Sequence, residues 1–223
     1  MAIYVVANPK GGVGKSTLAT NLAGYLARRE ALAPAGADAG PTVLLGDVDP
    51  QGSSRLWRSL RGADLPAIGA WVDDLDDLDD VGKRPKGVRQ VVLDTPAGLA
   101  GKDLNAVMRL ADRVLVPLQP SVFDIHATRH FIDQLQQRRK HAAVPIALVG
   151  NRVREHTFAA EQLDQFLALL REQVDVPVLG SLRDTHNYLH LAAHGLSLWD
   201  VAPGRVARDL AQWQPLIDWV EAA

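Results

Sequence analysis

The amino-acid sequence predicts an α/β fold, in which a twisted and mostly parallel sheet is covered by helices on both faces. Short apolar runs alternate with amphipathic segments almost to the end of the chain. These runs are continuously apolar, which is typical of parallel strands that are buried on both faces. A chain of 223 residues also has a length at which α/β sheets commonly form one core. We therefore expect residues 1–223 to form a single domain.

Six apolar runs predict the strands. In chain order they are "IYVVA", "TVLLGD", "VRQVVLD", "DRVLVPL", "PIALVGN" and "VPVLGSL", at residues 3–7, 42–47, 88–94, 112–118, 145–151 and 176–182. Each is short and apolar, as a buried strand should be. Because helical patterns separate several of them, the strands should lie parallel in one sheet.

Three segments between the strands predict helices. The first should begin near Ser16, since Leu18, Leu22, Tyr25 and Leu26 follow at helical spacing. The others cover residues 121–140 and 157–174. The apolar face of the last is formed by Leu163, Phe166, Leu167, Leu170 and Val174.

Two segments interrupt this alternation. Residues 31–40 are small, contain Gly and Pro, and predict a surface loop. Residues 71–87 place six aspartates before the basic residues Lys83, Arg84 and Lys86. Their carboxylates suggest a metal site, but their position between ordinary elements favours a solvated helix end or loop.

The composition excludes several classes of protein. The chain has no cysteine, so it has no disulfide, no thiolate nucleophile and no cysteine-ligated zinc or iron–sulfur cluster. It runs from Met1 into the first apolar strand without a secretion signal, and it lacks a run of about 18 apolar residues. We therefore expect a soluble, cytoplasmic protein without a membrane partner. The net charge of −2 means that nucleic-acid binding would need a local basic patch.

The stretch "VVANPKGGVGKST" at residues 5–17 predicts a phosphate-binding loop between a strand and a helix. In such a loop backbone N–H groups surround phosphate oxygens, Lys15 reaches the β- and γ-phosphates, and the Ser16 hydroxyl binds Mg²⁺. Pro9 stands where the standard motif has Gly, and Lys10 is a second lysine. The predicted ligands are ATP and Mg²⁺. The predicted nucleotide contacts are Gly11, Gly12, Val13, Gly14, Lys15, Ser16 and Thr17.

Aspartates stand at the carboxyl ends of two further predicted strands. Asp47 and Asp49 lie in "LLGDVDPQGSS", and Asp94 lies in "VVLDTPAG". Ligands of open parallel sheets bind at the carboxyl edge of the strands, so these side chains should converge on one metal–phosphate group. Asp94 has the position of a Walker B aspartate that binds Mg²⁺ directly or through water.

"KGGVGKST", "DVDPQG" and "DTPAG" together resemble the deviant Walker A ATPases of the ParA/MinD family, and the likeness extends over nearly the whole chain. It implies a P-loop NTPase fold and the hydrolysis of ATP. Lys10 would cross a dimer interface to the phosphates of the other subunit. Asp47 would support the hydration shell of Mg²⁺, and Asp49 would orient the attacking water. Asn151, in "NRV", would contact the adenine.

The resemblance implies the function of the small ParA-type ATPases. Such proteins dimerise around two ATP molecules and bind nucleoid DNA without sequence preference. A ParB-like protein or cargo adaptor stimulates hydrolysis, so that a plasmid, a chromosome or a large protein assembly is segregated or positioned. No segment precedes the first strand, so an operator-binding domain is not expected. The candidate DNA contacts are Arg154, Arg183, Arg205 and Arg208.

Two alternatives remain open. A MinD-like membrane-cycling regulator would need a basic amphipathic C-terminal helix. The tail instead contains Pro215, Asp218 and Glu221, with no Lys or Arg after Arg208, which favours packing of its apolar residues into the core. A metabolic ATP-dependent synthetase on the same scaffold would need a dedicated substrate pocket, which the sequence does not reveal.

Overall fold

The computed structural model describes residues 1–32, 40–79, 86–139, 144–173 and 176–222. Within this part of the chain, parallel strands form one sheet in the order β3-β2-β4-β1-β5-β6-β7. The strands are β1 (Ala2–Val6), β2 (Val43–Asp47), β3 (Gly69–Ala70), β4 (Gln90–Asp94), β5 (Arg113–Leu118), β6 (Ile146–Val153) and β7 (Val178–Arg183). All six predicted strands are confirmed. The two-residue strand β3 was not predicted, because it is too short for a periodic signal.

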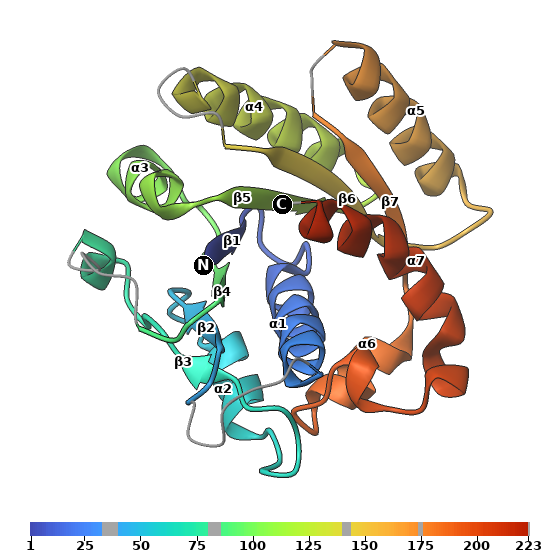
Figure 1. The fold of residues 1–223 in the computed structure, drawn as a ribbon. Coiled ribbons are helices and arrows are strands. Elements are labelled where there is room, and N and C mark those ends of the chain that lie inside the picture. Colours follow the sequence, from blue (N-terminus) through green and yellow to red (C-terminus); the bar gives the residue numbers. More distant parts are fainter. Residues whose placement is uncertain (33–39, 80–85, 140–143, 174–175, 223) are drawn as a thin grey trace.

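Helices cover both faces of the sheet (Figure 1). One face carries α1 (Lys15–Ala31), α2 (Ser53–Ser59), α6 (His186–Ala192), the short 3₁₀ helix η2 (Leu198–Asp200) and α7 (Pro203–Glu221). The other carries α3 (Gly101–Leu110), α4 (Val122–Arg139), α5 (Phe158–Gln173) and the 3₁₀ helix η1 (Asp76–Asp79). Successive side chains of β1 alternate between the two cores: Ile3 and Val5 enter one, and Tyr4 and Val6 the other. The predicted fold class is therefore confirmed.

The predicted helices at 121–140 and 157–174 correspond to α4 and α5. The predicted apolar face of α5 is buried at Leu163, Leu167 and Leu170 and partly buried at Phe166, whereas Val174 lies outside the described residues. Of the loop expected at 31–40, residues 33–39 also lie outside them. In the acidic segment, Asp76 and Asp77 are exposed on η1, and residues 80–85, including Lys83 and Arg84, are not described.

The C-terminal helix α7 packs into the core, as predicted. Trp213, Leu216 and Val220 are each at most 1% exposed and lie with the apolar residues of α1 and the sheet. Pro215 lies within the helix, and the backbone bends at Val206, which has φ −129°. Its apolar face is thus already occupied by its own domain. Among the described residues, no helix is long and apolar enough to cross a membrane.

A buried ion pair joins the segment after α2 to η2. Arg61 donates to both carboxylate oxygens of Asp200 at 2.8 and 3.0 Å, and the two side chains are 4% and 0% exposed. Burial alone would raise the pKa of Asp200, but hydrogen bonds from Arg61 and Ser197 hold this pKa below its ordinary value. Because the pKa of Asp200 is lower in the folded protein than in the unfolded chain, its carboxylate stabilises the fold at pH values above the pKa of the unfolded chain's carboxyl. This contribution is lost as the pH falls through the lowered folded pKa.

We expect Arg61→Ala to lower the free energy of unfolding by about 3–5 kcal/mol, because it leaves the Asp200 carboxylate buried and unpaired. Chemical denaturation at neutral pH measures this. The matched control is Arg89→Ala, which removes a more exposed pair, Arg89 Nη1 to Glu30 Oε2 at 3.0 Å, and should cost less than about 1 kcal/mol. Equal, small losses for both variants would contradict the assigned role of the buried pair.

Candidate nucleotide-binding site

The phosphate-binding loop lies at the carboxyl edge of β1, where glycine is required by geometry. Gly14 adopts φ +91° at the start of α1, and a Cβ there would lie 2.0 Å from Nδ2 of Asn151. Both the left-handed backbone and the close approach exclude larger residues. The loop borders a cavity of about 570 Å³. It is lined by Gly11, Gly12, Gly14, Lys15, Ser16, Thr17, Asp49, Pro50, Gln51, Ser53, Pro96, Ala97 and Arg152.

Lys15 is the first residue of α1 and is 6% exposed. Its Nζ donates to the carbonyl oxygen of Lys10 at 2.9 Å, so the loop holds the ammonium at the cavity. Burial lowers the pKa of Lys15, against the opposing effect of the Asp94 and Asp49 carboxylates. A buried ammonium beside backbone N–H groups at a helix start is suited to binding phosphate.

The sheet register brings the two buried aspartates together. Asp47 and Asp94 are paired positions on β2 and β4, and neither side chain is exposed. Asp94 Oδ2 accepts from Ser54 Oγ at 2.7 Å, whereas Oδ1 has no hydrogen-bond partner within the described chain. Burial raises the pKa of Asp94 to about 7, although the nearby hydroxyl groups of Ser16 and Ser54 oppose this. The spare carboxylate oxygen and the neighbouring Ser16 hydroxyl fit the oxygen ligands that Mg²⁺ prefers.

Asp47 and Asp49 also support the backbone that follows β2. The carboxylate of Asp47 accepts from the N–H of Asp49 at 3.2 Å and from the N–H of Arg55 at 2.8 Å. Asp49 lines the phosphate cavity, and its Oδ1 accepts from the N–H of Gln51 at 2.9 Å. Asp47 therefore lies behind Asp49, and a role in the hydration shell of Mg²⁺ stays a prediction.

The side chain of Lys10 has a different environment from that of Lys15. It is 41% exposed, and its Nζ lies 4.0 Å from Oδ1 of Asp124 on α4. Lys10 is not among the described residues that line the phosphate cavity. The two lysines of the motif are therefore positioned differently: Lys15 is buried at the cavity, and the side chain of Lys10 is partly exposed beside α4.

Asn151 lies beneath the loop. It is 2% exposed, and its Nδ2 donates to the carbonyl oxygen of Val13 at 2.8 Å. It also borders a second cavity of about 480 Å³, together with Thr17, Arg152, Arg183 and Tyr188. Asn151 thus fixes the loop at its observed position, while its contact with adenine stays a prediction.

The sequence reasoning missed several residues that support the loop. Asn8 is fully buried, and its Nδ2 donates to the carbonyl oxygen of Pro117 at 2.8 Å and to Thr128 Oγ1 at 3.0 Å. Gln119 Nε2 donates to the carbonyl oxygen of Gly12 at 2.5 Å. A polar residue directly after the first apolar strand was a usable signal for Asn8. Thr128 and Gln119 lie more than 100 residues from the loop in sequence, so only the folded structure shows that they contact it.

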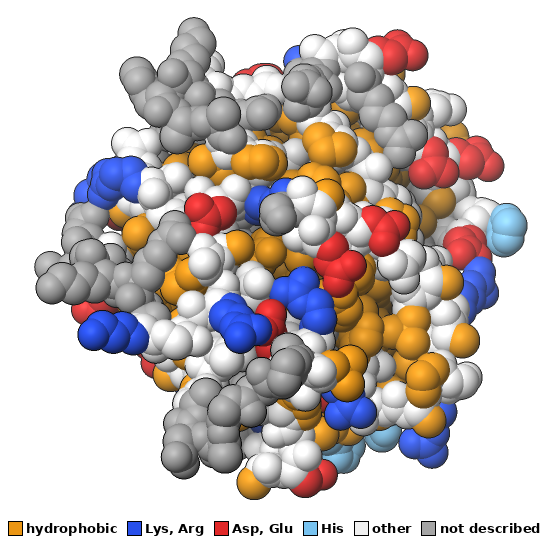
Figure 2. All heavy atoms as spheres, in the orientation of Figure 1, with side chains coloured by type: hydrophobic (Ala, Val, Ile, Leu, Met, Phe, Trp, Pro, Cys, Tyr) orange, Lys and Arg blue, Asp and Glu red, His pale blue; other side chains and the backbone are white. Residues whose placement is uncertain are grey.

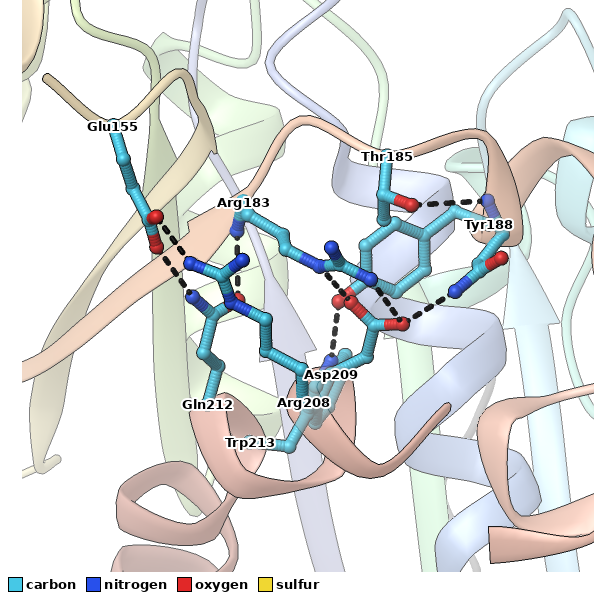
Figure 3. Close-up of polar contacts among 9 residues, drawn as sticks. Glu155, Arg183, Thr185, Tyr188, Arg208, Asp209, Gln212 and Trp213 are labelled. Carbon is cyan, nitrogen blue, oxygen red and sulfur yellow. Dashed lines mark hydrogen bonds and ion pairs between the residues drawn. The ribbon is translucent and has the colours of Figure 1, made fainter. Parts of the chain in front are cut away.

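Three of the four candidate DNA-binding arginines are paired with carboxylates of their own chain. Arg183 donates to buried Asp209 through Nε at 2.5 Å and Nη2 at 3.2 Å (Figure 3). Arg154 pairs with Asp184 at 2.8 Å, and Arg208 pairs with Glu155.

Arg205 lies exposed in the first turn of α7. Of the four candidates, Arg183 is the one held by a buried carboxylate, so its guanidinium is the least available to an external phosphate. On the face drawn in Figure 2, acidic and basic side chains are interspersed.

The glycine loop, Lys15, Ser16 and the buried carboxylates at the edge of a parallel sheet define a P-loop nucleotide-binding protein. The chain belongs to the CobQ/CobB/MinD/ParA nucleotide-binding domain family, whose model matches residues 4–198. The family resemblance seen in the motifs is therefore confirmed.

Proteins with related sequences include carboxysome-distribution and chromosome-partitioning proteins. A maintenance of carboxysome distribution protein A from Halothiobacillus neapolitanus is 29% identical over 209 residues, which cover 92% of this chain and 90% of that protein. One from Gloeobacter kilaueensis is 38% identical over 126 residues, so that 55% of this chain matches about half (51%) of that relative's length. The chromosome-partitioning ATPase Soj of Thermus thermophilus is 31% identical over 174 residues, covering 65% of this chain and 66% of Soj.

Solved structures share the fold. An ATP complex of a Cyanothece McdA variant superposes with a TM-score of 0.71 and 15% identity, covering 97% of this chain and 96% of the other. A plasmid partition protein from Borrelia burgdorferi bound to AMPPNP gives a TM-score of 0.71 and 18% identity, with 97% and 98% coverage. MinD of Aquifex aeolicus gives a TM-score of 0.66 and 18% identity, covering 89% of both chains.

Proposed function

We propose that this protein is an ATPase that dimerises around two ATP molecules, binds DNA without sequence preference, and segregates or positions a large cargo. The observation that carries the proposal is the different placement of the two motif lysines: Lys15 is buried at the phosphate cavity, and the partly exposed Lys10 side chain lies beside α4. A partly exposed cation next to a nucleotide loop is suited to the phosphates of a second subunit. The relatives that maintain carboxysome distribution or partition chromosomes support this class of function.

The residues at the cavity have separate tasks. Lys15 and the loop N–H groups bind the β- and γ-phosphates, and the Ser16 hydroxyl and Asp94 would hold Mg²⁺. Bound Mg²⁺ neutralises charge on the phosphate oxygens. Asp49, which lines the cavity, orients the attacking water, while Asp47 keeps the Asp49 backbone in place. Lys10 of the second subunit stabilises the negative charge that develops at the γ-phosphate.

The proposed homodimer uses the edge of the molecule around Lys10. Val122 and Phe123 begin α4 next to Asp124 and are 61% and 79% exposed. Large apolar side chains at this edge favour a protein partner there, because an interface buries them. A second copy in this position brings its Lys10 toward the first subunit's cavity. A ParB-like or cargo-adaptor protein is proposed as the stimulating partner.

Asp49→Ala is expected to bind Mg·ATP but to hydrolyse it at least about 100-fold more slowly than the wild type, because no carboxylate positions the attacking water. The variant should therefore accumulate as an ATP-bound dimer. Light scattering measures its molar mass, and phosphate release measures its rate of hydrolysis. Asp218→Ala, which removes an exposed carboxylate on α7, is the control and should keep the wild-type rate. Wild-type turnover in Asp49→Ala would reduce Asp49 to the turn residue that accepts from Gln51.

Non-specific DNA binding is proposed for α7 and its neighbours. Arg205, Arg208 and Arg154 are exposed, and dimerisation would double their number. Contacts with phosphates supply affinity without reading bases. Nucleoid association in the cytoplasm would follow from this activity.

We expect the double variant Arg205→Ala/Arg208→Ala to weaken the binding of the ATP dimer to arbitrary duplex DNA. If Z phosphates are contacted, the slope of log affinity against log salt is about −0.9Z, and removing up to two contacts should flatten it by up to about 1.8 per subunit. Salt titrations on unrelated sequences measure the slope. Lys86→Ala/Lys102→Ala removes the same charge from exposed positions elsewhere and should leave the slope unchanged. The same slope for both double variants would reject α7 as the DNA-binding face.

Packing argues against the MinD-like membrane alternative. A membrane-binding helix needs a free apolar face, and the apolar face of α7 is buried against α1 and the sheet. ATP-dependent attachment to anionic vesicles without binding to DNA would favour the alternative. ATP turnover without dimerisation would instead favour a metabolic synthetase.

A further inference from the structure

The segment from β5 into α4 holds the phosphate-binding loop at three points. Gln119 donates to the carbonyl oxygen of Gly12, Thr128 accepts from Asn8, and Asp124 faces the ammonium of Lys10. Each of these contacts joins residues that are more than 100 positions apart in sequence, and together they meet the loop at residues 8, 10 and 12. The first turns of α4 are therefore the structural support of the lysine-bearing part of the loop.

The contact through Asn8 fixes the backbone of Lys10. The Asn8 side chain accepts from the N–H of Lys10 at 2.9 Å while its Nδ2 donates to Thr128 Oγ1 and the carbonyl oxygen of Pro117. Asn8 and Thr128 are both fully buried. A satisfied buried amide is costly to disrupt, so the Lys10 backbone should remain attached to α4. The partly exposed side chain of Lys10 is held less firmly than its backbone, through the 4.0 Å contact between its Nζ and Oδ1 of Asp124.

Asp124 and Thr128 are four residues apart on α4, so they lie on the same face of the helix. The Asp124 side chain is only 15% exposed, and its Oδ1 lies 4.0 Å from Nζ of Lys10. At this separation the two groups form a charge pair without a short hydrogen bond. Such a pair orients the ammonium and still breaks readily when a stronger anion is presented.

We propose that Asp124 is a positioning residue that holds the Lys10 ammonium within its own subunit before dimerisation. When two ATP-bound subunits meet, each Lys10 leaves Asp124 for the phosphates bound by the other subunit. This inference rests on the proposed ATP-dependent dimer. Because each dimer breaks two such pairs, the effect of Asp124 on dimerisation enters twice.

The test is Asp124→Asn, which keeps the shape of the side chain and removes its charge. The measurement is made in an Asp49→Ala background, which retains ATP. There the dissociation constant of the dimer should fall about tenfold, because each of the two subunits contributes a factor of roughly three. Analytical ultracentrifugation over a range of concentrations measures it. The matched control is Asp133→Asn on the same helix. Oδ1 of Asp133 pairs with Nε of Arg129 at 3.4 Å, and removing this charge should leave the dissociation constant of the dimer unchanged. An unchanged or higher value for Asp124→Asn would overturn the proposal.

A second measurement separates this inference from the proposed function. In the nucleotide-free monomer, a double-mutant cycle of Lys10→Ala and Asp124→Asn should show coupling, seen as about a two- to fivefold change in the unfolding equilibrium constant. The absence of coupling would overturn the Lys10–Asp124 contact. If the wild-type protein failed to dimerise with ATP, the proposed function would be rejected, and the cycle would still decide whether Asp124 holds Lys10.

Discussion

Lys15→Ala is expected to weaken ATP binding by about 100-fold or more. Lys15 is the buried cation of the phosphate cavity, and its Nζ is held by the carbonyl oxygen of Lys10. Hydrogen bonds to charged groups contribute roughly 1.5–3 kcal/mol each, and losing those to two phosphates corresponds to at least about 3 kcal/mol, which is more than a 100-fold loss in affinity. Calorimetric titration with Mg·ATP measures this affinity directly.

The control for this variant is Lys102→Ala, which removes an exposed lysine from α3 and should retain wild-type affinity. Circular dichroism and thermal unfolding establish that Lys15→Ala is folded. Affinity unchanged from wild type in folded Lys15→Ala would contradict the assignment of the phosphate-binding loop.

Lys10→Ala is expected to keep ATP affinity within about threefold and to lose nearly all ATPase activity. Its ammonium lies beside Asp124, so its removal leaves the phosphate contacts of its own subunit intact. A cation supplied by a second molecule at the γ-phosphate accelerates phosphoryl transfer by about 10³–10⁵ in related chemistry. Titration and steady-state hydrolysis on one preparation separate binding from turnover.

Two outcomes would argue against this role of Lys10. A loss of affinity as large as that of Lys15→Ala would make Lys10 a ligand within its own subunit. Hydrolysis at the wild-type rate would make it a solvated loop residue.

The sheet could be predicted because its strands are short and continuously apolar, which is typical of parallel strands that are buried on both faces. The helices α2 and α6, each seven residues long, were not predicted, because two turns give too few positions for a periodic pattern. α7 could be assigned to the core from its sequence. Acidic residues and no basic ones accompany its apolar residues after Arg208, so these apolar residues fit the core better than a membrane surface.

The candidate site was predictable to the extent that its residues sit in local motifs. The loop follows β1, Asp47 and Asp94 are the last residues of β2 and β4, and Asp49 comes two residues after β2. Parallel strands end at one edge of the sheet, so these residues could be expected to meet there. Partners across the fold were not predictable, since Asn8 and Thr128 are 120 residues apart in sequence. The pairing of Arg183 with Asp209 was missed for the same reason, although it decides how available the guanidinium is.

If ATP assembles a dimer in which Lys10 acts on the other subunit, the molar mass in solution should depend on both ATP and Lys10. Multi-angle light scattering is performed on Asp49→Ala and on Lys10→Ala/Asp49→Ala, each with ATP and Mg²⁺ and each without nucleotide. We expect twice the chain mass of 24.1 kDa for Asp49→Ala with ATP, and 24.1 kDa in the other three samples. A monomeric Asp49→Ala protein at saturating ATP, or a double variant that dimerises as well as Asp49→Ala, would contradict it.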